Sequence, residues 1–166
     1  MIFRLLATGS RNWNDWHAVD HAFTDVLLQL PVGSTLVVVH GDCPDGRPRR
    51  PPGLDAIADR WARSPIIAAR HPEYTILAEP HPADWDRACD NNCHHRPRSK
   101  NGRPYCPMAG NLRNQDMVDF GAHVGLGFPL PGSRGTYDCM MRARAAGIRV
   151  QAIDRHTGQQ GLRDTA

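Results

Sequence analysis

Short apolar runs alternate along this chain with segments of helical periodicity, and this alternation limits the possible folds more than any other feature. Four runs have the length and composition of strands, at residues 2–7, 35–39, 74–78 and 122–128. The second of these runs is continuously apolar and rich in β-branched residues, which is typical of a central parallel strand buried on both faces. Residues 148–152 alternate apolar and polar side chains and predict a last, edge-like strand.

Helical periodicity fills the intervals between these runs. In the first interval the apolar residues recur on one helical face, and they are Trp16, Val19, Phe23, Val26, Leu27 and Leu30. Later intervals predict a helix at residues 54–61 that is broken or restarted near Pro65, one at 109–120, and one at 137–146 that ends at Gly147. Parallel strands need crossover connections, so we expect a doubly wound, Rossmann-like parallel α/β sheet of about five strands.

Length and composition indicate one intracellular domain. We expect a single domain over residues 1–153, with an inserted loop at 86–107 and a polar tail at 154–166. No run approaches the roughly 20 apolar residues of a membrane span, and the N-terminus lacks a signal-peptide pattern, so the expected location is cytoplasmic. A net charge of +3 is too small to argue for nucleic acid as a partner. The basic residues are arginines apart from Lys100, which suggests a GC-rich coding sequence from an actinobacterium or one of its phages.

The sequence PGSRGTYD at residues 131–138 lies between a predicted strand and a predicted helix. Gly132 and Gly135 allow the backbone to approach a ligand closely, and the first-turn N–H groups of the helix favour an anion. A tight turn without a ligand is the alternative interpretation of such a loop taken alone. With further motifs at the same sheet edge, the loop predicts a phosphate-binding turn.

Two further motifs follow predicted strands, GSR at residues 9–11 and HGD at residues 40–42. Serine hydroxyls and arginine guanidinium groups suit phosphate, and a carboxylate suits ribose hydroxyls. Each residue alone has an ordinary structural explanation, as a turn residue, a first-turn carboxylate or a strand-end histidine. Because the carboxyl ends of parallel strands share one edge, we expect a nucleotide-like or phosphosugar pocket. Its predicted ligand-binding residues are Gly9, Ser10, Arg11, His40, Gly41, Asp42, Asp55, Gly132, Ser133, Arg134, Gly135 and Thr136.

In order and spacing these motifs resemble the YspA-like (cpYpsA-related) branch of the SLOG superfamily. The resemblance covers residues 1 to about 153 and includes further motifs, LDAIA at 54–58, PADW at 82–85 and AGNLRNQDM at 109–117. It implies a Rossmann-like homodimeric module that binds a nucleotide or nucleotide-derived ligand in order to sense or sequester it. Arg113 and Asn114, in the last motif, join the ligand-binding residues on this ground.

The LOG-type phosphoribohydrolases, enzymatic members of the same superfamily, imply a second function, the release of a base from a nucleoside monophosphate. Arg113 matches the arginine of their R-K-x-x-M motif, and residues 131–136 fit their P-G-G-x-G-T-x-x-E motif apart from its second glycine. Cys139 stands at the glutamate position, and Asp138 is rotated from it by about 100° on a helix. Arg113 and Asp138 are therefore the candidate catalytic residues, but the missing glutamate favours binding. Single-stranded nucleic-acid binding is a third alternative, supported by the arginine-rich residues 96–103.

The inserted loop is too long and too polar to order itself, and it contains three cysteines and two histidines. Cys89, Cys93 and Cys106 have the spacing C-x3-C-x12-C, which in a cytoplasmic protein favours metal thiolates over disulfides. A histidine would complete a structural Cys3His zinc site, and His95 reaches more easily than His94. Free cysteines in a disordered loop are the alternative.

Three other residues have open roles. Trp13 and Trp85 could each stack on a base or serve as packing residues. Cys139 has no motif that marks a paired base, so we expect it to be buried against the sheet.

Overall fold

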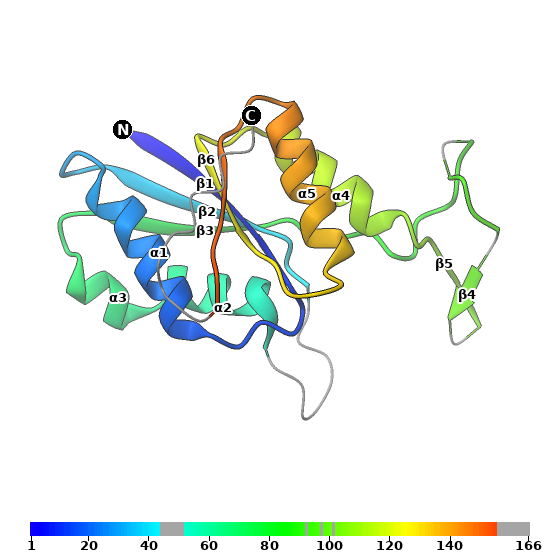
Figure 1. The fold of residues 1–166 in the computed structure, drawn as a ribbon, viewed down its shortest axis with the longest axis horizontal. Coiled ribbons are helices and arrows are strands. Elements are labelled where there is room, and N and C mark those ends of the chain that lie inside the picture. Colours follow the sequence, from blue (N-terminus) through cyan, green and yellow to red (C-terminus); the bar gives the residue numbers. More distant parts are fainter. Residues whose placement is uncertain (44–51, 92, 97, 101, 156–166) are drawn as a thin grey trace.

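Five parallel strands form one sheet in the order β3-β2-β1-β6-β7 (Figure 1). The computed structural model describes residues 1–43, 52–91, 93–96, 98–100 and 102–155. The strands are β1 (Ile2–Gly9), β2 (Thr35–His40), β3 (Thr75–Pro80), β6 (Val124–Phe128) and β7 (Val150–Ala152). After β3 the chain returns to the other side of β1, so the strand order reverses between β1 and β6. The predicted Rossmann-like class is confirmed, with β7 at an edge.

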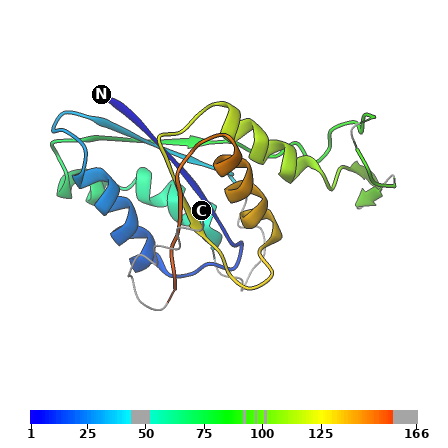
Figure 2. The same ribbon diagram turned by 45° about the horizontal axis from the view of Figure 1, so that its top comes forward.

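Helices cover both faces of this sheet (Figures 1 and 2). One face carries α1 (Trp16–Leu28), α2 (Gly53–Ala62) and α3 (Pro65–Arg70), and the other carries α4 (Ala109–Asp119) and α5 (Arg134–Ala145). The expected restart at Pro65 occurs because the Ser64 hydroxyl accepts the Ile67 N–H, 3.4 Å away, and so caps α3. α5 begins three residues earlier than the periodicity predicts, so the loop at residues 131–133 leads directly into its first turn.

Each face of the sheet has its own apolar core. The larger core lies under α1 and α2, where Phe23 meets both Trp61 and Phe128 edge-on at ring distances of 5.1 and 6.1 Å. Trp13 is fully buried in this core and lies edge-on to Phe128, so it is a packing residue rather than a base-stacking one. The smaller core lies under α4 and α5 and contains the fully buried Cys139, as expected.

The inserted loop contains an antiparallel hairpin that projects beyond α4, away from the sheet (Figures 1 and 2). Its strands are β4 (Arg98–Lys100) and β5 (Arg103–Tyr105). Three-residue strands of mostly charged and polar residues have no apolar alternation, so the sequence pattern did not predict them. Of the predicted tail, residues 156–166 lie outside the described part of the chain.

No helix among the described residues combines the length and the apolar character needed to cross a bilayer.

A bidentate ion pair joins β1 to β3 across β2 and gives the fold a testable pH dependence. Both Arg4 nitrogens Nη1 and Nη2 lie 2.6 Å from the Glu79 carboxylate, and this pair lowers the pKa of Glu79 to about 2. Because the folded value lies below the ordinary 4.5, the pair stabilises the protein fully above pH 4.5, and this contribution is lost as the pH falls toward 2.

We therefore expect Glu79→Gln to lower the free energy of unfolding by about 1 kcal/mol at pH 7, and by less at pH 3. Urea unfolding at the two pH values measures the difference. The matched control is Glu73→Gln, which changes an exposed glutamate and should have little effect at either pH. An equal loss for Glu79→Gln at both pH values would contradict this role of the ion pair.

Candidate functional site

A cavity of about 430 Å³ lies at the carboxyl ends of β1, β2 and β6, where the strand order reverses. Most of the predicted ligand-binding residues line it, namely Gly9, Ser10, Arg11, Gly41, Asp55, Arg113, Asn114, Gly132, Ser133, Arg134, Gly135 and Thr136. His40 and Asp42 are not among the residues that line it. Motifs far apart in the sequence thus meet at one edge of the sheet.

The loop before α5 forms one wall of the cavity and has a defined local structure. The Ser133 hydroxyl accepts the Leu130 N–H at 3.0 Å, and the Arg134 N–H donates to the Gly132 carbonyl at 2.8 Å. α5 begins at Arg134, and the N–H groups of a first helical turn have no acceptor within the helix. Gly135 and Thr136 belong to this turn and line the cavity, so this wall favours an anion.

Arg113 reaches from α4 to the loop after β2. Its Nη1 donates to the Gly41 carbonyl and, at 3.3 Å, to the His81 carbonyl, while Nε donates to Asn114 Oδ1 at 3.2 Å. A Cβ atom at residue 41 would overlap the guanidinium group, so a larger residue there would displace the arginine from this contact. A guanidinium carries five N–H donors, and these contacts use only part of that capacity.

Asn114 joins α4 to the first turn of α5. Its side chain is buried, and Nδ2 donates to the Gly135 carbonyl at 3.1 Å and to Asp138 Oδ2 at 3.0 Å. Its Oδ1 accepts from Arg113, so one amide orients both the arginine and the first turn of α5. Asn114 therefore acts mainly as a positioning residue at the edge of the cavity.

The two residues near the glutamate position of a LOG-type hydrolase have other roles. The Asp138 carboxylate accepts hydrogen bonds from Asn114 and, at 2.9 Å, from Arg142 Nε, and Asp138 is not among the cavity-lining residues. Cys139 is fully buried under α5, and burial raises the pKa of its thiol to about 11. The structure thus places the predicted acid Asp138 between α4 and α5.

Asp55 lines the cavity but is engaged by backbone. Its carboxylate accepts the Cys43 N–H at 3.1 Å and the Gly41 N–H at 3.4 Å. The carboxylate thus fixes the start of the loop after β2. The structure therefore supports a positioning role for Asp55, and the ribose contact remains a prediction.

His40 is buried below the cavity and supports the same loop. Its Nδ1 accepts the Asp42 N–H at 3.2 Å, and its Nε2 lies 3.3 Å from Asp59 Oδ1. Burial lowers the pKa of His40, so the ring is neutral near pH 7. Asp42 itself is exposed and has a φ of +44°, a conformation that aspartate tolerates in turns. Neither residue is among those that line the cavity, so a ligand contact of either one remains a prediction.

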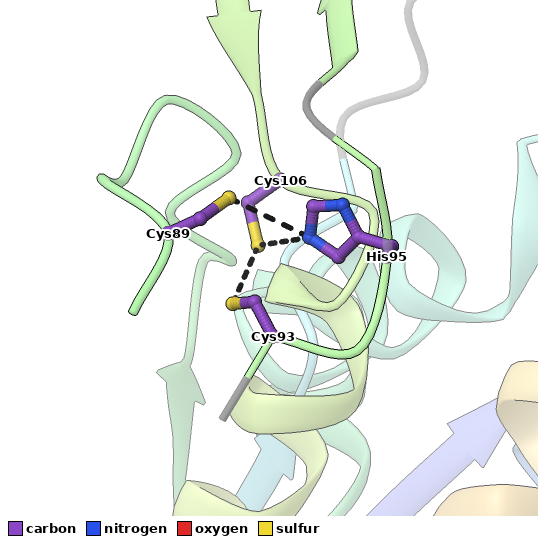
Figure 3. Close-up of side chains that lie close together, drawn as sticks. All are labelled: Cys89, Cys93, His95 and Cys106. Atoms are coloured by element: carbon purple, nitrogen blue, oxygen red, sulfur yellow. Dashed lines mark hydrogen bonds between the residues drawn. The ribbon is translucent and has the colours of Figure 1, made fainter. Parts of the chain in front are cut away.

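The inserted loop brings together the four predicted metal ligands (Figure 3). The ligand atoms of Cys89, Cys93, His95 and Cys106, here called the Cys/His cluster, all lie within 4.8 Å of one another. His95 Nε2 is 3.5 Å from Cys89 Sγ and 3.7 Å from Cys106 Sγ, and the Cys93 and Cys106 sulfurs are 3.8 Å apart. These residues could hold a metal ion. His94 is exposed and is not part of the cluster.

Neighbouring groups prepare the cluster to bind a cation. His95 Nδ1 donates to the Arg96 carbonyl at 2.7 Å, so Nε2 faces the sulfurs and can donate to Cys106 Sγ or, once deprotonated, ligate a metal. Burial alone would raise the pKa of the Cys106 thiol. Hydrogen bonds from His95, the Met108 backbone and Arg87 outweigh this effect and lower the pKa to about 6. A thiolate and a neutral imidazole are the forms that ligate metals.

Several cavity-lining residues were not predicted as ligand contacts. Tyr105 and Pro107 flank Cys106 of the Cys/His cluster, and Asn12 directly follows the GSR motif. Thr8 precedes this motif and also lines the cavity. Only their position beside motif residues could have predicted that they line the cavity, because their side-chain types form no motif of their own.

The Asn114 contacts predict a measurable stability effect. Replacing Asn114 with Ala removes a buried amide that bridges two helices, so we expect a loss of about 2–3 kcal/mol in the free energy of unfolding. Denaturant unfolding measures this loss. Asp116→Ala, on the exposed side of the same helix, is the control and should cost much less. Equal losses in the two variants would contradict the bridging role.

Comparison with known proteins identifies a relative. No protein-family model matches the chain. The chain is similar to the "Gene 61 protein" of Mycobacterium phage D29, with 40% identity over 147 residues, which cover 89% of this chain and 93% of that protein. The alignment spans nearly the full length of both chains, so the similarity extends over the whole fold. The protein described here therefore belongs to the family of the phage D29 Gene 61 protein.

Proposed function

We propose that this protein is a nucleotide-binding module of the YspA-like SLOG type, which senses or sequesters a nucleotide or nucleotide-derived ligand. One observation carries the proposal. Arg11, Arg113 and Arg134 line the same cavity as the first turn of α5, at the position where Rossmann-like sheets bind phosphorylated ligands. This arrangement concentrates positive charge and N–H donors where a phosphate group would lie.

The size of the cavity supports a small ligand. A volume of about 430 Å³ lies in the range of small-molecule sites and suits a nucleoside monophosphate. Ser10 adds a hydroxyl whose oxygen accepts the Asn12 N–H at 3.1 Å, so its own proton is available to a ligand. Phosphate and sugar therefore both have suitable contacts within one cavity.

Binding is favoured over hydrolysis of the glycosidic bond. Such hydrolysis needs a carboxylic acid or carboxylate directed at the bond that breaks. Asp138 is engaged by Asn114 and Arg142, and Asp55 is engaged by two backbone N–H groups. Both carboxylates therefore accept structural hydrogen bonds, and these compete with proton transfer to a ligand.

We also propose that the Cys/His cluster binds zinc as a structural ion. Tetrahedral zinc, at about 2.3 Å from sulfur and 2.0–2.1 Å from nitrogen, separates two sulfurs by about 3.8 Å and sulfur from nitrogen by about 3.6 Å. The three distances given above for the cluster match these edges. Three sulfurs and one imidazole fill four positions, so the ion would have no site for a catalytic water.

Nucleotide binding can be tested directly. Denaturing the purified protein and analysing the supernatant by mass spectrometry should identify any co-purified nucleotide. Titration calorimetry with AMP, GMP, CMP and UMP should then detect binding. Arg134→Ala should weaken the binding by about ten- to a hundredfold, because a charged hydrogen bond contributes about 1.5–3 kcal/mol. Arg149→Ala removes an exposed arginine that does not line the cavity and should leave affinity within twofold.

The same samples separate binding from catalysis. Nucleotide that remains intact after long incubation supports a sensing or sequestering role, whereas free base would favour the hydrolase. Lack of binding by each nucleoside monophosphate and by any co-purified compound would overturn the nucleotide proposal.

The zinc proposal predicts which residues control metal content. Cys93→Ser and His95→Ala should lose the stoichiometric zinc that the unmodified protein retains, as measured by elemental analysis after dialysis. His94→Ala and Cys43→Ser alter residues outside the cluster and should keep a full equivalent. A Cys93→Ser protein that retained one equivalent of zinc would show the assignment to be wrong.

A further inference from the structure

We propose that Trp85 is the surface on which the base of the ligand stacks, and that the metal in the Cys/His cluster holds this surface in place. The inference rests on the proposed nucleotide-binding function and adds to it the recognition of a planar aromatic ring. It also makes the metal an organising element of the ligand site. Metal binding and base recognition would then be thermodynamically linked.

One wall of the cavity is aromatic, whereas the loops that line the rest of it are polar. Trp85 and Tyr105 line it, with ring centroids 5.5 Å apart and ring planes only 6° from parallel. Arg11 lies over the indole, with its guanidinium carbon 5.5 Å from the ring centroid. Trp85 is half-buried and lines the cavity, unlike the fully buried Trp13. An indole beside cations and a phosphate-binding turn matches the parts of a nucleotide.

Close contact with α4 fixes the position of the indole. A Cβ atom at Gly110 would lie 3.2 Å from Trp85 Cη2, so the ring packs directly on the first turn of α4. Arg113 lies one turn further along the same helix. The aromatic wall and the arginine therefore share one rigid support.

The Cys/His cluster lies directly behind this wall. Tyr105 is adjacent to Cys106, and the Cys106 N–H donates to the Trp85 carbonyl at 2.9 Å. Cys89 follows Trp85 by four residues. The Cys106 carbonyl accepts the Ala109 N–H at 3.1 Å, which joins the cluster to the start of α4. A metal bound to Cys89 and Cys106 would thus fix the segments that carry Trp85 and Tyr105.

This arrangement predicts that the ring and the phosphate of a ligand depend on different parts of the protein. Stacking of a base on an aromatic side chain contributes about 1–3 kcal/mol. Losing it should lower the affinity for a nucleotide about five- to a hundredfold, while affinity for the sugar phosphate stays the same. By linkage, a bound nucleotide should raise the affinity of the protein for the metal, whereas a bound sugar phosphate should not.

Calorimetry with two probes tests the inference. The probes are the tightest-binding nucleoside monophosphate from AMP, GMP, CMP and UMP, and ribose 5-phosphate, which has the sugar and phosphate but no base. Trp85→Ala in the metal-loaded protein should lose nucleotide affinity five- to a hundredfold and keep ribose 5-phosphate affinity within twofold. Trp85→Phe keeps an aromatic face and should stay within about fivefold of the unmodified protein for both probes.

Metal removal provides a second arm that requires no substitution. Chelator-treated protein should lose nucleotide affinity as Trp85→Ala does, and reloading with zinc should restore it.

Quenching of tryptophan emission by the nucleotide should be present in the unmodified protein and absent in Trp85→Ala.

The outcomes distinguish this inference from the proposed function. Equal losses for nucleotide and ribose 5-phosphate in Trp85→Ala would overturn the stacking role while leaving nucleotide binding intact. Unchanged nucleotide affinity after metal removal would overturn the link to the cluster. If neither probe nor any co-purified nucleotide binds the metal-loaded protein, the proposed function fails, and this inference fails with it.

Discussion

The guanidinium of Arg113 lies against the backbone at Gly41, and the geometry of the cavity depends on this contact. The arginine comes from α4 on one face of the sheet. The glycine follows β2, and the next helix along the chain, α2, lies on the opposite face. Asn114 extends the contact by binding both Arg113 and the first turn of α5. Three segments that are remote in the sequence, namely the loop after β2, α4 and the first turn of α5, are thereby fixed relative to one another.

Much of the fold follows from the sequence because its strands and helices have strong apolar patterns. Residues 36–39 are apolar throughout and form part of an interior strand, and the helix expected from Trp16 begins at that residue. The start of α5 was predicted three residues late because its first residues, Arg134 and Gly135, are polar or small. Periodicity locates the apolar face of a helix better than its ends, which depend on local hydrogen bonds.

The cavity could be predicted as a region, but the role of each residue in it could not. The topology brings the loops after parallel strands to one edge, which is why Gly9 and Arg134 line one cavity. Whether a polar side chain faces that cavity depends on partners elsewhere in the chain. His40 turns toward Asp59, and Asp138 is engaged by Arg142, and neither partner is marked by a motif. Tyr105 lines the cavity because of the hairpin beside Cys106, which no sequence pattern indicated.

The hairpin of β4 and β5 lies between two residues of the Cys/His cluster, His95 and Cys106. The chain leaves the cluster at the histidine and returns to it at the cysteine, so the segment between them is a loop whose two ends meet at the cluster. Lengthening such a loop costs little free energy, since each doubling of a flexible loop adds only about 0.6 kcal/mol of closure entropy. Evolution can therefore vary the part of the hairpin away from Tyr105 in length and charge, and an engineer can insert a reporter or affinity tag there, while the ligand cavity keeps its shape.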